Sequence, residues 1–179
     1  MFSLDVLFYV FIFIFALIGA IRGWAKEVIG TFSIFLGLYV ITVLQTYVPA
    51  VASYLENSPI SSQIGFKAIV LGFVVFCGYQ TPNLPMFVQN QRFQRDKMQD
   101  LILGFAVGAI NGFMLFGSLW FFVHEGNYPY SFIFAPIAGT PAGDAALDLI
   151  RMLPPAWLVS PYIYFAIAIS FMFVLVVFI

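Results

Sequence analysis

The stretch LDVLFYVFIFIFALIGAI, residues 4–21, decides the fold of this chain. After Asp5 it contains no charged residue, and an α-helix of about 20 apolar residues is long enough to cross the ~30 Å hydrocarbon core of a bilayer. The stretch therefore predicts a membrane-spanning helix. Its flanking cations, Arg22 and Lys26, follow the apolar run, whereas a cleaved signal peptide carries its cations in front. We expect an uncleaved first span with the N-terminus outside the cytoplasm.

The composition of the whole chain indicates the same environment. Of its 179 residues, 63% are hydrophobic and 8% are charged, whereas soluble domains carry about 25% charged residues. So few charges cannot cover a protein of this size in water. The net charge of −1 gives no sign of nucleic-acid binding. We predict an all-α, polytopic transmembrane protein whose partners are membrane lipids and other membrane protein subunits, with no nucleic acid.

Four further apolar runs divide the rest of the chain. They cover residues 28–48, 59–80, 101–123 and 162–179, and residues 50–57 form a short connection between the first two. Because the uninterrupted apolar part of the run at 59–80 is short, the sequence predicts four to five spans within a single membrane domain, residues 1–179. The last run is apolar up to Ile179, so we expect the natural chain to continue beyond it.

The distribution of cations predicts the orientation. With the N-terminus outside, the inner connections hold Arg22, Lys26, Arg92, Arg95 and Lys97. The outer segments then hold only Lys67 and Arg151. Cytoplasmic loops of membrane proteins carry an excess of lysine and arginine, so this topology follows the rule and the reverse topology breaks it.

A further helix is predicted at residues 141–153, within the long link before the last run. Thr140 can cap its start, and Asp144, Asp148 and Arg151 share one face of a helix. This pattern fits an amphipathic helix at the outer membrane surface, and it fits equally a helix packed on its own protein.

Three glycines recur every four residues in the run at 101–123. Gly104, Gly108 and Gly112 place three positions without side chains on one helix face, and such faces allow close helix–helix approach in lipid. Asn111 lies beside this face and requires a hydrogen-bond partner across the contact. We predict a packing face, whose partner helix belongs either to the same chain or to another subunit.

The turn between the first two runs is the densest polar cluster between spans. It reads Arg22-Gly23-Trp24-Ala25-Lys26-Glu27. Glu27 begins the second helix, where its charge meets the positive end of the helix dipole, and Arg22 can reach Glu27 or a lipid phosphate. We expect an inner turn held at the headgroups, and a partner-docking site is the alternative.

Residues for enzyme chemistry are scarce, and we predict that the protein is not an enzyme. His124 is the only histidine and Cys77 the only cysteine, so neither a nucleophile–base pair nor a catalytic metal set is predicted. His124 with Glu125 is a weak candidate for binding a metal or a chlorophyll-type pigment, and otherwise forms an interfacial polar pair. No cofactor is required by the sequence, although 23 phenylalanines suit lipid or pigment contact. No ionisable residue is expected at the middle of a span.

Two stretches together resemble the colicin V production protein family of bacterial inner-membrane proteins. The first is Leu4-Asp5, opening a span that runs to Gly19 and is followed by IRGWAKE at residues 21–27. The second is DLILG at residues 100–104, continued through the glycine repeat to Asn111-Gly112. Asn111 stands where the family often has a basic residue, and the run at 162–179 exceeds the usual four spans. The resemblance implies a location in the inner membrane and involvement in colicin V production or envelope upkeep.

We therefore expect a non-enzymatic structural or accessory subunit that docks through its glycine face. One alternative is a transporter or export component working as an oligomer, with Asn111, Gln45 and Thr42 as the polar groups of its path. Another is a peripheral subunit of a photosynthetic or respiratory membrane complex.

Overall fold

The computed structural model describes residues 4–80 and 97–178, and their regular structure is helical. The helices are α1 (Leu4–Arg22), α2 (Trp24–Tyr47), α3 (Pro49–Asn57), α4 (Ile60–Tyr79), α6 (Lys97–Glu125), α7 (Pro141–Arg151), α8 (Pro154–Trp157) and α9 (Tyr162–Phe178). Four of them, α1, α2, α4 and α6, are long and apolar enough to cross a membrane. The predicted all-α, polytopic fold is confirmed. The fifth predicted span corresponds to α9, an apolar helix of 17 residues.

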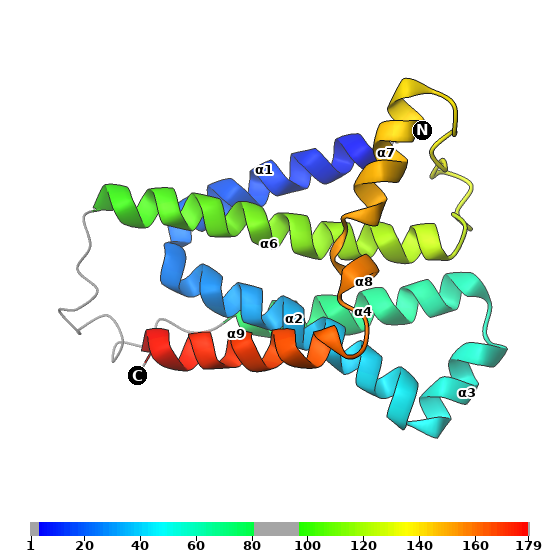
Figure 1. Cartoon of the computed structure of the whole chain (residues 1–179), viewed down its shortest axis with the longest axis horizontal. Coiled ribbons are helices and arrows are strands. Elements are labelled where there is room, and N and C mark those ends of the chain that lie inside the picture. Colours follow the sequence, from blue (N-terminus) through cyan, green and yellow to red (C-terminus); the bar gives the residue numbers. More distant parts are fainter. Residues whose placement is uncertain (1–3, 81–96, 179) are drawn as a thin grey trace.

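The long helices form two layers (Figure 1). α1 and α6 lie together in one layer, and α2, α4 and α9 form the other. The short helices α3 and α7 lie at the end of the bundle where α1 begins, which we call the N-terminal end. The turn between α1 and α2 lies at the opposite end, together with the start of α6. This arrangement places the predicted inner turn and the predicted glycine repeat at neighbouring positions.

Several helix boundaries differ from the sequence-based expectation, and α2, for example, begins at Trp24 instead of residue 28. The connection at residues 50–57 is helical, because Pro49–Asn57 forms helix α3 with proline in its first turn, where the missing N–H has no helical partner to lose. Helix α6 begins at Lys97 instead of residue 101. The apolar run marks the part of a helix that lipid or protein can bury, whereas backbone hydrogen bonding continues through polar residues that form helices well.

The core joins the two layers. Its larger cluster contains Ile34 and Leu38 of α2, Leu71 of α4 and Met114 of α6. A second cluster at the N-terminal end packs α7 against α1 and α6 through Ile150, Phe8 and Trp120.

Helix α7 therefore packs on its own protein, and the Thr140 cap is present, since the Gly143 N–H donates to the Thr140 hydroxyl at 3.1 Å. Asp144, Asp148 and Arg151 are exposed on its other face. The position of this helix at a membrane surface remains a prediction.

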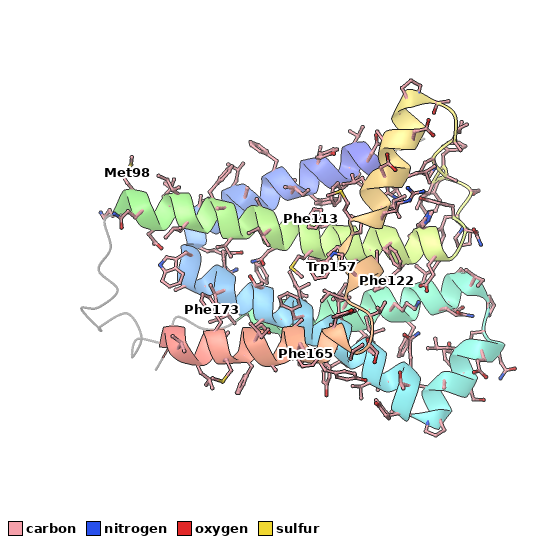
Figure 2. All side chains as sticks on the ribbon, viewed as in Figure 1. Met98, Phe113, Phe122, Trp157, Phe165 and Phe173 are labelled. Carbon is pink, nitrogen blue, oxygen red and sulfur yellow. The ribbon has the colours of Figure 1, made fainter. Side chains whose placement is uncertain are left out.

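Large apolar side chains remain exposed on the outside of the bundle. Phe165 and Phe173 on α9 are labelled in Figure 2, and they are 63% and 51% exposed. In water such a surface would aggregate, whereas in a bilayer the same side chains contact lipid. The exposed surface agrees with the composition of the chain.

Candidate functional site

The glycine repeat of α6 forms the contact between α6 and α1. A Cβ atom added at Gly104 or Gly108 would overlap the backbone of α1, and at Gly108 it would lie 3.0 Å from the Gly19 Cα atom. The two backbones are therefore too close for any side chain. Gly112 continues the contact, since a Cβ there would lie 2.9 Å from the Ile12 Cα atom. The partner of the glycine face is a helix of the same chain, so the expected docking of another subunit through this face is wrong.

The turn between α1 and α2 is fixed by the first turn of α6. Gly23 has a φ of +84°, a left-handed conformation that side chains rarely adopt. The Asp100 carboxylate accepts a hydrogen bond of 3.1 Å from the Trp24 backbone N–H. Asp100 therefore caps α2 from another helix, where a negative charge also meets the positive end of the α2 dipole.

Glu27, in the first turn of α2, is the centre of a buried polar cluster. Its side chain has no exposed surface. One carboxylate oxygen, Oε1, lies 2.6 Å from Nη1 of Arg22, and the other, Oε2, accepts a hydrogen bond of 2.8 Å from the Tyr79 hydroxyl. We call Arg22, Glu27, Thr31, Tyr79 and Asn111 the Glu27 cluster.

Asn111 joins the cluster from α6. Its amide N–H₂ group donates to the Glu27 Oε2 atom and to the Glu27 backbone carbonyl, both at 2.9 Å. Its amide oxygen accepts a hydrogen bond of 2.7 Å from the Thr31 hydroxyl. The expectation that Asn111 bonds across the glycine contact is wrong, since its partners lie on α2 and, through the Tyr79 hydroxyl at 3.2 Å, on α4. One residue of rotation turns it from the face of Gly112 toward these neighbouring helices.

Arg22 and Tyr79 close the cluster toward the end of the bundle. The Arg22 guanidinium lies 4.2 Å from the centre of the Tyr79 ring and donates a hydrogen bond of 3.2 Å to the Tyr79 backbone carbonyl. The ring itself occupies space that Gly30 leaves free, since a Cβ at that glycine would lie 2.8 Å from a ring carbon. Tyr79, at the end of α4, thus covers the carboxylate of Glu27.

The Glu27 cluster extends from the α1–α2 turn into the interior of the bundle. Asn111 lies 14 residues after Lys97 in a helix of 29 residues, or about 20 Å along it. Glu27 contacts this residue and has no exposed surface, so the helices enclose its side chain, and the position of the turn at the headgroups stays a prediction. Arg22 keeps one fifth of its side chain exposed, and Lys26 is half-buried in the first turn of α2.

The chemistry of the cluster is that of a satisfied ion pair. No buried side-chain nitrogen or oxygen of the described residues lacks a hydrogen bond. A buried charge is tolerated only when it is paired and hydrogen-bonded, and Glu27 meets both conditions through groups from α1, α4 and α6. The cluster can therefore hold three helices around α2, and its carboxylate is enclosed.

Thr31 and Tyr79 were missed by the sequence reasoning. Glu27 itself is a signal for such partners, because an acidic residue next to a span requires hydrogen-bond donors when the helices pack over it.

His124 and Glu125, the weak metal or pigment candidates, have separate partners. The His124 Nδ1 atom lies 3.3 Å from the Tyr128 hydroxyl, and Glu125 pairs with Lys67 at 2.6 Å. Burial raises the pKa of Tyr128, although a hydrogen bond from the Trp120 indole acts in the opposite direction. Within residues 4–80 and 97–178, no three His, Cys, Asp or Glu side chains gather as metal ligands.

Comparison with known proteins identifies the family. The model of the colicin V production protein family matches residues 4–131, a range that contains the α1–α6 glycine contact and the whole Glu27 cluster. Neither the search of curated proteins nor the search of solved structures found a match. With four helices among the described residues long enough to cross a bilayer, this chain is a multi-pass membrane protein that belongs to the colicin V production protein family.

Proposed function

We propose that the protein is a non-enzymatic structural or accessory subunit of an assembly in the bacterial inner membrane. The observation that carries this proposal is the closure of the Glu27 cluster. Five side chains satisfy one another inside the bundle and fix the relative positions of α1, α2, α4 and α6. Because the interior of the bundle is fixed in this way, we infer that the protein acts through its outward surfaces, by contacting other molecules.

The partners in this proposal are membrane lipids and other membrane protein subunits. The glycine face is occupied by α1, so a subunit has to contact the outward sides of the bundle. Helix α4 offers one such side, where Ile69 and Phe73 are 72% and 67% exposed. Lipid also covers this surface wherever no subunit does.

We further propose that the N-terminus lies outside the cytoplasm. Arg22, Lys26 and Lys97 belong to the end of the bundle opposite the N-terminal end, at the α1–α2 turn and the start of α6. Arg92 and Arg95, which the prediction also counted, lie outside the described residues. The excess of cations supports a cytoplasmic location of this end.

A cross-linking experiment tests the accessory role. Cys77, the only cysteine, is exposed on α4 and can carry a benzophenone cross-linker through a maleimide. In native membranes we expect a discrete adduct with one other membrane protein, and the same protein should co-purify in mild detergent. A matched control carries Cys77→Ser with the single cysteine moved to Ile34, which is fully buried and should give no adduct. A monomer without adducts or co-purifying protein would contradict the proposal.

The rival function is transport through an oligomer, and the burial of Glu27 is the observation in its favour. Ionisable residues inside membrane helices often belong to proton or ion pathways. Proteoliposomes with an imposed pH gradient separate the two functions. A subunit of the proposed kind leaves the gradient intact, whereas a proton flux that Glu27→Gln abolishes would establish transport.

A further inference from the structure

A small cleft lies at the N-terminal end of the bundle, between α2, α4, α6 and the segment after α8. It encloses about 210 Å³, which is below the ~300–1,000 Å³ of pockets for drug-sized ligands. Its floor is apolar and includes Leu38, Ile41 and Leu158. The cleft is therefore large enough for a headgroup or a similarly small polar group, with apolar surface on which a chain can continue.

One positive and one negative side chain stand together in the wall of the cleft. Lys67 of α4 and Glu125 of α6 form an ion pair with an Nζ–Oε2 distance of 2.6 Å. The Lys67 ammonium also lies 5.4 Å from the centre of the aromatic ring of Phe122, which is labelled in Figure 2. The Lys67 side chain is 15% exposed and that of Glu125 is 54% exposed. The pair is thus held by the protein on the lysine side and accessible on the glutamate side.

The ion pair has bonding capacity to spare. An ammonium has three N–H donors and a carboxylate can accept about four hydrogen bonds. The pair itself uses one donor and one acceptor. Gln45 of α2 adds an amide to the wall of the same cleft.

From these features we propose that the cleft binds a zwitterionic phosphoethanolamine group. Its phosphate would accept hydrogen bonds from the Lys67 ammonium and the Gln45 amide, and its ammonium would donate to the Glu125 carboxylate. The paired charges of the cleft sum to zero, so they match a ligand that carries both signs better than a net anion or a net cation. Apolar residues below the pair fit the glycerol and acyl part of a phospholipid. The proposal depends on the membrane setting of the proposed function but needs no protein partner, so each can fail without the other.

Native mass spectrometry of the full chain, released from detergent micelles, tests the ligand. The probes are dilauroyl phosphatidylethanolamine, phosphatidylcholine and phosphatidylglycerol, which share their acyl chains. Choline keeps the positive charge but has no N–H to donate to Glu125, and glycerol removes the charge. We expect phosphatidylethanolamine to bind at least about tenfold more tightly than the other two lipids. Equal retention of the three lipids would overturn the proposal.

Competition with free O-phosphoethanolamine distinguishes the two sources of this group. Displacement of the lipid by the soluble compound at millimolar concentration would identify a site for the free zwitterion. Retention of the lipid would show that its acyl part is required and identify a lipid site.

Variants then locate the site. Lys67→Gln and Glu125→Gln should each lower the affinity for phosphatidylethanolamine about tenfold. Arg151→Gln removes a cation from the exposed Asp148–Arg151 pair on α7 and should leave the affinity unchanged. Gln45→Leu leaves the Lys67–Glu125 ion pair, and the contact between α4 and α6 that this pair makes, intact. It should lower the affinity several-fold, and it tests the site even if the Lys67 and Glu125 variants do not fold. If Arg151→Gln and Lys67→Gln change the affinity equally, the cleft is refuted as the site. It is also refuted if the single variants Gln45→Leu and Glu125→Gln both leave the affinity unchanged.

Discussion

At the scale of single residues, the protein depends on one buried carboxylate. Glu27 contributes a charge that groups from three other helices, α1, α4 and α6, must neutralise or hydrogen-bond, because water cannot reach it. The ion pair with Arg22 is expected to add little net stability over an apolar pair, but removal of one partner leaves the other charge uncompensated. The pair therefore fixes which helices meet more than it strengthens their contact.

Arg22→Met should lower the free energy of unfolding by up to about 3 kcal/mol, since it leaves the Glu27 charge unpaired in the bundle. The double variant Arg22→Met with Glu27→Gln should recover part of this loss, because a neutral amide needs no counter-charge. Reversible unfolding by sodium dodecyl sulfate in mixed micelles, followed by tryptophan fluorescence, gives both values. Arg151→Met is the matched control, because its partner Asp148 is solvent-exposed and such pairs contribute at most about 1 kcal/mol. If the effects of Arg22→Met and Glu27→Gln on the free energy of unfolding simply add, the two residues are not coupled.

At the scale of helices, close backbone approach determines which elements are neighbours. Gly19 on α1 meets Gly104 and Gly108 on α6, and a side chain at any of these positions would overlap backbone of the other helix. Lipid tails solvate apolar side chains as well as a protein does, so the helices gain from dispersion contacts at short distance. The Asp100 cap then holds the start of α2 against the same helix.

Gly108→Leu should destabilise the fold by about 1–3 kcal/mol, the usual cost of overpacking, because the side chain must separate α1 from α6. Gly72→Leu on α4 is the matched control, since a Cβ there meets nothing within 4 Å. Both changes gain the same helix propensity, so their difference in unfolding free energy isolates the α1–α6 contact. Equal stabilities would remove the glycine contact from the account of the fold.

Asp100→Ala should lower stability by about 0.5–2 kcal/mol, because the Trp24 N–H loses its acceptor and the start of α2 loses a favourable charge. Hydrogen exchange should rise at the first turn of α2 before it rises elsewhere. Asp144→Ala is a suitable comparison, since its carboxylate accepts from the Gly139 N–H at an exposed helix start. An unchanged exchange rate at Trp24 would show that the cap is dispensable.

At the scale of the whole molecule, the two ends of the bundle differ in their charged residues. The end with the α1–α2 turn holds Arg22, Lys26 and Lys97 beside the acidic Glu27 and Asp100, whereas the N-terminal end holds Glu56 and a Glu125 that is paired with Lys67. The helices between them expose apolar side chains on their outward faces. This distribution supports the proposed orientation, with the α1–α2 turn in the cytoplasm.

Cysteine labelling measures this orientation directly. In a Cys77→Ser background, Glu56→Cys places a thiol on exposed α3 at the N-terminal end, and Gln99→Cys places one on exposed α6 at the other end. An impermeant maleimide added to intact spheroplasts should label the cysteine at position 56 and should label position 99 only after lysis. The reverse pattern would invert the topology and place the N-terminus in the cytoplasm.

The sequence by itself determined the solvent of this protein and its helices. Apolar runs such as residues 4–21 are local, and each helix satisfies its own backbone hydrogen bonds, so no knowledge of neighbours is needed to predict a span. The pairing of the charges in Arg22-Gly23-Trp24-Ala25-Lys26-Glu27 was also predictable, because both partners lie within one turn.

Only the tertiary structure decided which helix the glycines meet and what surrounds Glu27. The partners Tyr79 and Asn111 are 52 and 84 residues away in the chain, and no local pattern links them to Glu27. A one-residue rotation on α6 separates Gly112, which faces α1, from Asn111, which faces α2. Helix periodicity defines such faces, but the packing of five helices at once decides what each face contacts.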